Sequence, residues 1–424
     1  MKKFVLTFFI VMILATSLFA QSVTEATKDE DEIVHLNFVE ILPTEERTIL
    51  LKQVIENYEK DHPNVEIELI TFSEDEAYEG LSSMIKEGTA DICEVRDRSV
   101  AKFIEEDLYY NLDDLIGEWS NSVQLIDAAL EVSSSIGEGC TYFIPLYLYV
   151  KALIVRTDIL AQYGLTAPTT MDEFRAVCST LVAQGNGQYA FALKGTTPCR
   201  IMDVLFCSYI DNIDPDNIYL TTDGHFYLDT DGGRAALEAY VRLYKNYCPP
   251  ESIDWTFSDQ IQGFVSGQTP LLVQDSDAIM LIDQYLDESQ YQVVPIPVGT
   301  TGKRYLDQGF AGLAVASTSK YPEEAFEFIK YMVSANINTQ ICEFYGALPV
   351  NKQAYYLSDT FKNEDYKVGI EQLTYEDTVL MRFPLDDSRF LGYQKVHETA
   401  IKELLLGNAT VEETIQTLKE YWGY

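Results

Sequence analysis

Positive charge is scarce in this sequence. Its 424 residues contain 30 Lys and Arg against 67 Asp and Glu, so the formal net charge is −37. A field of that sign repels phosphate groups, which excludes a nucleic-acid-binding protein and disfavours a basic face on anionic lipid. The acidic excess favours one rival ligand class, a cationic solute such as a polyamine. Spreading acidic residues over the surface for solubility is the simpler interpretation.

Motifs that would identify an enzyme or a metal site are also missing. The four histidines are scattered and form no H-E-x-x-H, and neither G-x-S-x-G nor C-x-x-C occurs. Residues 185–190 (GNGQYA) fit G-x-G-x-x-A but follow a predicted helix, so we interpret them as a turn. A glycosidase needs only a pair of carboxylates. Among 67 acidic residues some pair will always look suitable, so the presence of one does not indicate a glycosidase. We expect no enzymatic activity, no metal and no cofactor, with a secreted carbohydrate-active enzyme as the alternative.

Hydrophobic runs long enough to suggest a membrane segment are confined to the N-terminus. Lys2 and Lys3 precede an apolar stretch of about 15 residues, which is short of the ~20 that span a bilayer. Ala20 offers a small residue for cleavage, so we predict a secretory signal peptide over 1–20 and a flexible acidic leader over 21–32. No cysteine lies near the cleavage site to carry a lipid anchor. The predicted location is periplasmic or extracellular.

Cysteine is present in an odd number. Export permits disulfides, but seven cysteines leave at least one unpaired. Cys199 and Cys207 are close enough in sequence to pair, although the sequence does not fix the connectivity. Buried free thiols are the favoured interpretation for most of the seven.

Alternating strands and helices follow the leader. Residues 33–40 alternate apolar and polar side chains as a strand does, 51–58 have helical spacing, and 65–69 alternate again. Such a β-α-β unit implies a parallel sheet with helices on its faces. A third strand is predicted at 91–95, and it ends at the polar loop 96–98.

A second set of elements begins near residue 142. The apolar and aromatic run 142–155 contains Pro145, which argues for a strand that bends or changes its partner. Thr170 and Glu173 form a capping box that begins a helix. Later extended segments are predicted at 270–274, 293–298, 308–316 and 345–350, and later helices at 233–247, after Pro322 and after Thr410.

The organisation is two α/β lobes with the chain passing between them more than once. We predict lobe 1 from residues 33–146 plus 313–346, and lobe 2 from 147–312 plus 347–424. Several connections restrain twisting between the lobes but permit bending about them, as in a hinge beside a ligand cleft. No repeat and no long linker occurs.

The order and spacing of five segments resemble one protein family. The segments are VIENYEKDHPNVEIEL at 54–69, TADICEV at 89–95, the run 142–174 with its Ile-Pro and P-T-T-x-x-E-F, FVSGQTPLLVQ at 264–274, and AVASTSKYPEEAFEFIKYMVS at 314–334 with Leu-Pro-Val at 348–350. They are similar to the extracellular solute-binding proteins of ABC importers, family 1, which mostly carry sugars. The resemblance implies a type II periplasmic-binding-protein-like fold. Each lobe would be a mixed, mainly parallel sheet flanked by helices, and a multi-segment hinge would join the two.

The resemblance also implies a function. We expect a monomer that captures a small solute, most often a carbohydrate, between the lobes and presents it to the transmembrane subunits of an ABC permease. A sensory receptor subunit of the same fold is a further alternative.

A sugar site needs aromatic platforms for C–H faces and planar polar groups for hydroxyls. These side chains are expected at strand ends that face the crevice. The candidate ligand-binding residues are Glu40, Asp97, Arg98, Tyr147, Tyr149, Trp255, Asp275, Asp277, Gly309 and Phe310. Asp97 and Arg98 match an Asp-Arg pair that some family members use for hydroxyls, and Gly309 would let the backbone approach a ligand closely.

Structural roles compete with these candidates. Glu40 has the alternative of a solvated loop carboxylate, and Asp97 with Arg98 that of a surface ion pair. Core packing is the alternative for the tyrosines at 147 and 149. Helix N-capping competes for the aspartates at 275 and 277. Trp255 lies in a polar loop, where an exposed tryptophan favours a platform.

Overall fold

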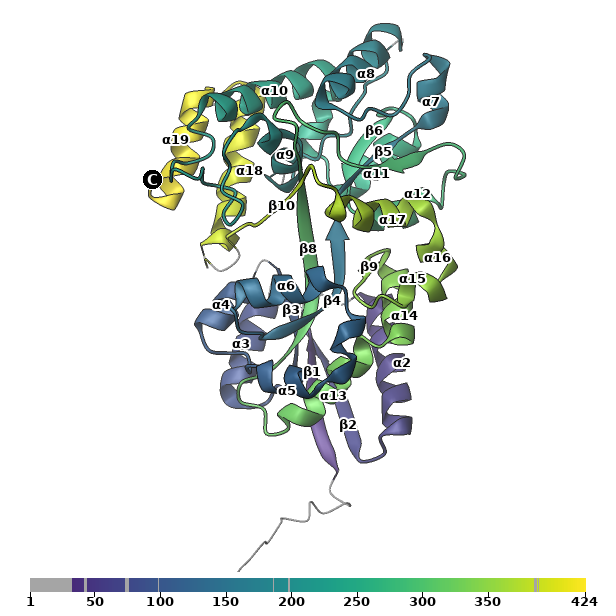
Figure 1. Ribbon diagram of the computed structural model, residues 1–424, viewed down its shortest axis with the longest axis vertical. Coiled ribbons are helices and arrows are strands. Elements are labelled where there is room, and N and C mark those ends of the chain that lie inside the picture. Colours follow the sequence, from purple (N-terminus) through teal and green to yellow (C-terminus); the bar gives the residue numbers. More distant parts are fainter. Residues whose placement is uncertain are drawn as a thin grey trace, which may run out of the picture.

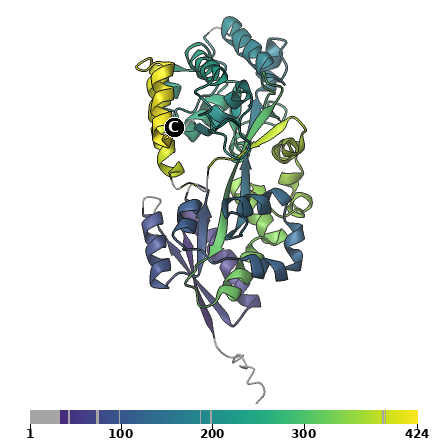
Figure 2. The ribbon, with the colours of Figure 1, turned by 60° about the vertical axis from the view of Figure 1, so that its left-hand side comes forward.

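The computed structural model describes residues 33–41, 44–72, 76–97, 99–185, 187–196, 199–384, 387 and 389–424. They form two lobes that follow one another along the long axis of the molecule (Figure 1). In a view turned by 60°, the two lobes are again distinct, and α18 and α19 lie along one side of the upper lobe (Figure 2). The predicted signal peptide, the predicted acidic leader and Arg98 lie outside the described residues.

The larger sheet forms the centre of lobe 1 and continues toward lobe 2. Its strand order is β2-β1-β3-β8-β4-β9, and β10 pairs with β8. Its strands are β1 (Val34–Glu40), β2 (Val65–Thr71), β3 (Ile92–Arg96), β4 (Phe143–Val150), β8 (Arg304–Val315), β9 (Leu348–Pro349) and β10 (Thr378–Met381). β1 pairs in parallel with both β2 and β3, as the predicted β-α-β unit requires, whereas β8 is antiparallel to β3 and β4. The sheet is therefore mixed.

Helices cover both faces of this sheet. They are α2 (Glu45–Asp61), α3 (Ala77–Glu87), α4 (Val100–Glu105), α5 (Asp113–Glu118), α6 (Asp127–Ile136), α13 (Pro322–Met332), α14 (Ala335–Tyr345) and α15 (Ala354–Leu357). The Thr44 hydroxyl caps α2 by accepting from the Arg47 amide, and the helix ends before Pro63 as predicted. Phe328 of α13 packs between Phe38 of β1 and Tyr58 of α2, with ring centroids 5.9 and 5.0 Å away.

Lobe 2 has a smaller sheet of order β6-β5-β7, in which β5 is antiparallel to both neighbours. Its strands are β5 (Ala152–Val155), β6 (Leu271–Gln274) and β7 (Gln292–Val294). Its helices are α7 (Thr157–Gln162), α8 (Met171–Gln184), α9 (Cys199–Phe206), α10 (Asp231–Tyr247), α11 (Phe257–Val265), α12 (Asp277–Ile282), α16 (Asp359–Lys362), α17 (Glu364–Glu371), α18 (Phe390–Leu406) and α19 (Val411–Trp422). The predicted capping boxes of Thr170 and Thr410 are both confirmed.

Three segments join the lobes. β4 continues through Lys151 into β5, β8 runs back beside it, and a third segment passes from β9 through α15 and α16 to α17 (Figure 1). The β4–β8 register shifts between Pro145 and Tyr147, so the predicted bend at the proline is confirmed as a bulge. The proposed lobe boundaries at 146 and 312 fall inside β4 and β8. Both strands are therefore continuous across the predicted boundary, where the hinge is expected.

The C-terminal part of lobe 2 contains an aromatic cluster. Its members are Tyr219, Tyr227, Phe383, Phe390, Tyr393 and Trp422. The ring centroid of Tyr219 lies 4.8 Å from that of Tyr393 and 5.6 Å from that of Trp422. His397 lies one helical turn after Tyr393, with their centroids 5.6 Å apart. The cluster therefore anchors the C-terminal helices to the body of the lobe.

The structure differs from the predicted elements in two places. Residue 345 ends a helix instead of beginning an extended segment, because Gly346 adopts a left-handed conformation (φ 64°) that closes α14. β8 begins at Arg304, earlier than predicted, because its first four residues pair with β10. Within the described residues, six cysteines are free thiols, Cys207 among them, and no helix is long and apolar enough to cross a membrane.

Candidate functional site

A buried charge network lies at the carboxyl ends of β1 and β3. Arg47, near the start of α2, forms ion pairs with Glu40 of β1 and Glu94 of β3. The Thr48 hydroxyl donates to Glu40 at 3.0 Å, and the Ile41 amide donates to Glu94 at 2.9 Å. Burial raises the pKa of Glu40, and Arg47 opposes that rise. Because Glu40 is 0% exposed and its carboxylate is already bonded, it belongs to the floor of the site.

Tyrosine rings continue this network toward lobe 2. The Tyr147 centroid lies 5.4 Å from that of Tyr149 and 5.0 Å from that of Tyr345. The Arg47 guanidinium lies 5.6 Å from the centre of the Tyr345 ring, a cation–π contact. Tyr147 is buried, which raises its pKa to about 12, whereas Tyr149 remains partly exposed. Tyr345 is partly exposed as well, so Tyr149 and Tyr345 are the two rings of this row with accessible surface.

The opposite half of the site follows the end of β6. Lys151, between β4 and β5, pairs with Asp275 at 3.2 Å and with Asp307 at 2.9 Å. Burial, together with the neighbouring Asp275, raises the pKa of Asp277 to about 7. Its Oδ1 atom is buried and accepts no hydrogen bond. The N-cap of α12 is Ser276, whose side chain makes no capping bond, so these aspartates do not serve as side-chain caps of this helix.

The two halves meet at Tyr149 and Asp277. Gly346 of lobe 1 approaches so closely that a Cβ there would lie 3.0 Å from the Asp277 Cα. The Tyr149 hydroxyl is held neutral mainly by burial. It also lies within reach of the charges of Asp277 and Asp275 from lobe 2 and of Arg96 from lobe 1. One aromatic ring thus lies between charged groups of both lobes.

We call this group of residues the inter-lobe cluster. Its members are Glu40, Arg47, Glu94, Arg96, Asp97, Tyr147, Tyr149, Tyr345, Lys151, Lys194, Asp275, Asp277 and Asp307. The structure therefore brings six of the ten predicted residues together. Of the other four, Arg98 lies outside the described residues.

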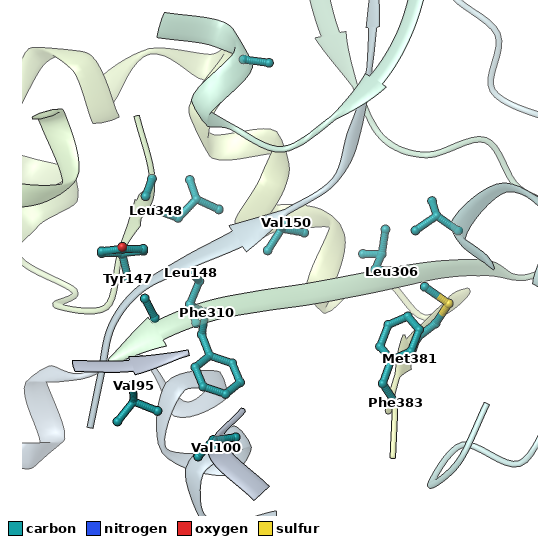
Figure 3. Close-up of a cluster of buried hydrophobic side chains, with 14 of the residues drawn as sticks. Val95, Val100, Tyr147, Leu148, Val150, Leu306, Phe310, Leu348, Met381 and Phe383 are labelled. Atoms are coloured by element: carbon teal, nitrogen blue, oxygen red, sulfur yellow. The ribbon is translucent and has the colours of Figure 1, made fainter. Parts of the chain in front are cut away.

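Gly309 and Phe310 separate onto the two faces of the β4–β8 ribbon. Gly309 pairs with Tyr149, so it shares the face of the inter-lobe cluster and leaves room above the ring. Phe310 points the other way, because successive strand residues alternate. It is 1% exposed, stacks on Phe143 at 5.1 Å, and is directed toward Val100 (Figure 3). Phe310 is therefore a core residue of lobe 1.

Trp255 packs on lobe 2 and stays partly exposed. A Cβ on Gly263 of α11 would lie 2.6 Å from its indole, so the glycine is what admits the ring. The Trp255 carbonyl accepts from the Thr196 amide at 3.3 Å. One side of the ring is therefore held by α11, and its role as a platform stays a prediction.

Sequence reasoning missed the charged residues that are buried with the tyrosines. Arg96 and Glu94 belong to β3, and Lys151 separates two apolar strands. A charged residue inside a buried strand needs a partner, and that is the signal that would have identified all three. Within the described residues, no group of three or more His, Cys, Asp or Glu side chains is arranged to hold a metal ion.

A small inter-lobe hollow lies on the opposite face of the ribbon. It holds about 60 Å³ between α6 of lobe 1 and residues 380–383, at the end of β10 and directly after it. Gln308 of β8 lines it, and the buried Nε2 atom of this side chain has no hydrogen-bond partner.

Comparison with known proteins gives the same two-lobed arrangement. The putative ABC transporter periplasmic-binding protein YcjN of Escherichia coli K12 is 23% identical over 383 residues, which is 85% of this chain and 84% of that protein. The GacH receptor of Streptomyces glaucescens superposes with a TM-score of 0.75 at 20% identity, over 92% of this chain and 97% of its own. The sugar-binding protein MalE of Xanthomonas citri superposes with a TM-score of 0.76 at 15% identity, over 91% and 96%.

The family assignment rests on a match that covers more than half of the chain. Residues 44–338 match the bacterial extracellular solute-binding proteins. This span includes β2 to β8, the hinge ribbon and every member of the inter-lobe cluster except Glu40 and Tyr345. The chain therefore belongs to the bacterial extracellular solute-binding proteins, and it is the solute-binding component of an ABC transporter.

Proposed function

We propose that this protein captures a carbohydrate in the inter-lobe cluster, closes around it without altering it chemically, and presents it to a membrane permease after export by its signal peptide. The observation that carries the proposal is the position of Tyr149, a partly exposed ring flanked by Arg96 of lobe 1 and by Asp275 and Asp277 of lobe 2. An aromatic face can stack on the C–H face of a sugar, and the flanking charged groups can bond its hydroxyls.

A ligand of this kind would favour the closed form because it contacts both lobes. A solute shifts the hinge equilibrium only if it binds the closed form more tightly than the open form. A sugar on Tyr149 that bonds Arg96 and Asp277 at once makes contacts that separated lobes cannot provide. The comparisons support the ligand class, since the GacH receptor was solved in complex with acarbose and MalE is described as a sugar-binding protein.

The charge of the cluster favours one second candidate, a cationic solute. Among its described residues, carboxylates outnumber cations by six to four: Glu40, Glu94, Asp97, Asp275, Asp277 and Asp307 against Arg47, Arg96, Lys151 and Lys194. Most of these charges are already paired inside the protein. The pairing leaves a polar rather than a strongly anionic surface, which favours a neutral, hydroxyl-rich ligand.

A ligand screen tests the proposal. We expect one or more of maltose, maltotriose and tagatose to raise the unfolding midpoint, because a ligand at 100 times its Kd adds about 2.7 kcal/mol to the native state. Spermidine and arginine should have no such effect. Calorimetry should give a saturable isotherm, X-ray scattering a more compact particle, and mass spectrometry an unchanged sugar. A midpoint raised only by spermidine would support the cationic alternative, and sugar conversion would reveal an enzyme.

A matched pair of variants locates the binding. Tyr149→Ala should weaken the affinity, whereas Tyr356→Ala on α15, whose side chain is 79% exposed outside the cluster, should leave it unchanged. Equal affinities in the two variants would place the sugar elsewhere in the molecule.

A further inference from the structure

A separate groove on lobe 1 has walls suited to a hydroxyl-rich ligand. It lies between the end of α2, the short 3-10 helix Ser120–Gln124 after α5, and α13, and its volume is about 430 Å³. We call it the α2–α13 groove. Its size lies within the range of small-molecule sites. We propose that the α2–α13 groove is a second carbohydrate-binding site, independent of the inter-lobe cluster and of hinge closure.

Aromatic rings form the walls and are fixed in place by neighbours. Trp119 is partly exposed, and its ring meets Phe326 edge-on with centroids 5.8 Å apart. His62 and Tyr331 are also partly exposed, and the buried Tyr58 supports both: its ring stacks on His62 at 4.0 Å and lies 5.1 Å from Tyr331. Rings that are already immobilised lose little rotamer entropy when a ligand stacks on them.

The remaining lining provides hydrogen-bonding groups with little net charge. Asn121 and Gln124 contribute planar amides that both donate and accept, which suits a sugar hydroxyl. Glu118 and Glu327 also line the groove, and Glu327 is paired with Lys330 on the same helix. Lys330 repels a cationic ligand such as a quaternary ammonium but Glu118 attracts one, so choline is the competing ligand that the test includes.

All the lining residues belong to lobe 1, which separates this site from closure. α2 has 17 residues, so at ~1.5 Å per residue it is about 25 Å long. Arg47 of the inter-lobe cluster lies near its beginning, whereas Tyr58 lines the groove near its end. A ligand held there makes the same contacts in the open and closed forms, so it cannot shift the hinge equilibrium.

Fluorine NMR can test this directly, because the chain has only three tryptophans. In protein labelled with 5-fluorotryptophan, maltotriose and mannotriose are titrated in turn, and the three signals are assigned by single Trp→Phe variants. For at least one of the two, we expect a saturable shift of the Trp119 signal in the millimolar range. The shift should persist in Tyr149→Ala, in which the inter-lobe cluster is damaged.

A double variant in the groove should weaken binding there and leave the inter-lobe cluster intact. Asn121→Ala with Gln124→Ala removes both amides but leaves the Gln124 carbonyl, which accepts from the Lys352 amide. We expect this variant to bind the trisaccharide at least about fivefold more weakly at Trp119, since each lost hydrogen bond contributes about 1 kcal/mol. Binding at the inter-lobe cluster should not change.

Two results would overturn the proposal. One is a Trp119 signal that neither trisaccharide moves. The other is a signal that choline chloride moves and the trisaccharides do not, which would identify a cation site. Since Tyr149→Ala tests the inter-lobe cluster separately, failure of either site is recognisable without the other.

Discussion

The inter-lobe cluster and the aromatic cluster of lobe 2 are both buried and both rich in tyrosine, yet they differ in what surrounds the rings. Tyr147 and Tyr149 share their space with ion pairs contributed by separate lobes. Tyr219 and Tyr393 pack on further rings of the same lobe. The comparison teaches that the neighbours of a tyrosine, rather than the number of tyrosines, distinguish a candidate binding surface from a core.

The two clusters also contain titratable groups that respond to pH in opposite directions. Burial and the neighbouring Asp275 raise the pKa of Asp277. Mild acid therefore protonates this carboxylate, and the neutral form is more favourable than the charged form at this position. His397 is 0% exposed and has its pKa lowered to about 3 by burial, so acid places a charge where none is solvated. Lower pH should therefore favour closure of the first region and weaken the second.

The largest expected effect is the loss of the cation in the inter-lobe cluster. Arg47→Met leaves Glu40 and Glu94 buried together without their partner, and removing one partner of a buried pair costs about 3–5 kcal/mol. Urea denaturation at neutral pH measures this change in unfolding free energy. Adding Glu40→Gln and Glu94→Gln should recover part of the loss.

An arginine at the edge of the aromatic cluster is the control. Arg389 pairs with Asp387 but its side chain is 54% exposed, so Arg389→Met should cost less than about 1 kcal/mol. If both arginine variants lose the same stability, the contrast between a buried charge network and a solvated ion pair is wrong.

The next effect concerns acid stability of the aromatic cluster. In the unfolded chain His397 titrates near 6.5, and in the folded lobe near 3. The contribution of the neutral side chain is complete above pH 6.5 and is lost as pH falls toward 3, so at pH 5 the unfolding free energy drops by about 2 kcal/mol. Calorimetry at pH 7 and 5 measures the difference.

Two histidine variants separate this effect from the general acid response. His397→Leu should reduce the loss between pH 7 and 5. His225→Gln should not, because that imidazole is 73% exposed. An undiminished loss in His397→Leu would assign the acid sensitivity to other groups.

A third prediction concerns closure itself. In this structure the pKa of Asp277 is about 7, and we expect it to return toward the ordinary value of 3.8 if separation of the lobes exposes this side chain to water. The closed form then binds more protons, so closure is favoured as pH falls from about 7 to 4, by at most about tenfold per unit. X-ray scattering of the ligand-free protein across this range measures the average compactness. Asp277→Asn should flatten the pH dependence, and a slope of the opposite sign would refute the assignment.

Local patterns in the sequence predicted much of this fold. The alternation at 33–40, the stop at Pro63 and the capping boxes at Thr170 and Thr410 all depend on neighbours a few residues apart. Such signals are complete within one element, which is why these elements were predicted correctly.

The site was harder to predict because its contacts are long-range. Arg47 and Glu94 are 47 residues apart, and the local sequence around either residue does not predict that it pairs with the other. Phe310 was predicted together with Gly309, but successive strand residues face opposite sides, and the pairing of Gly309 with Tyr149 leaves Phe310 on the core side. The sequence also does not reveal that Trp255 packs against α11, because this packing depends on a glycine eight residues later that makes room for the indole. Register and packing of this kind are properties of the assembled fold.

The smallest expected effect tests the comparison between tyrosines directly. Tyr149→Leu removes the ring between the lobes, and a stacked aromatic contact contributes about 0.5–1.5 kcal/mol beyond area burial. The affinity for the sugar with the largest thermal shift should fall by about two- to twelvefold. Tyr227→Phe in the aromatic cluster removes a hydroxyl that donates to Asp203 at 3.1 Å, so it should cost about 1 kcal/mol of stability without changing the affinity. Calorimetric titration and urea denaturation of both variants give four values. If Tyr227→Phe weakens binding as much as Tyr149→Leu does, the affinity reflects the stability of lobe 2 as a whole, and the ring at 149 has no special part in it.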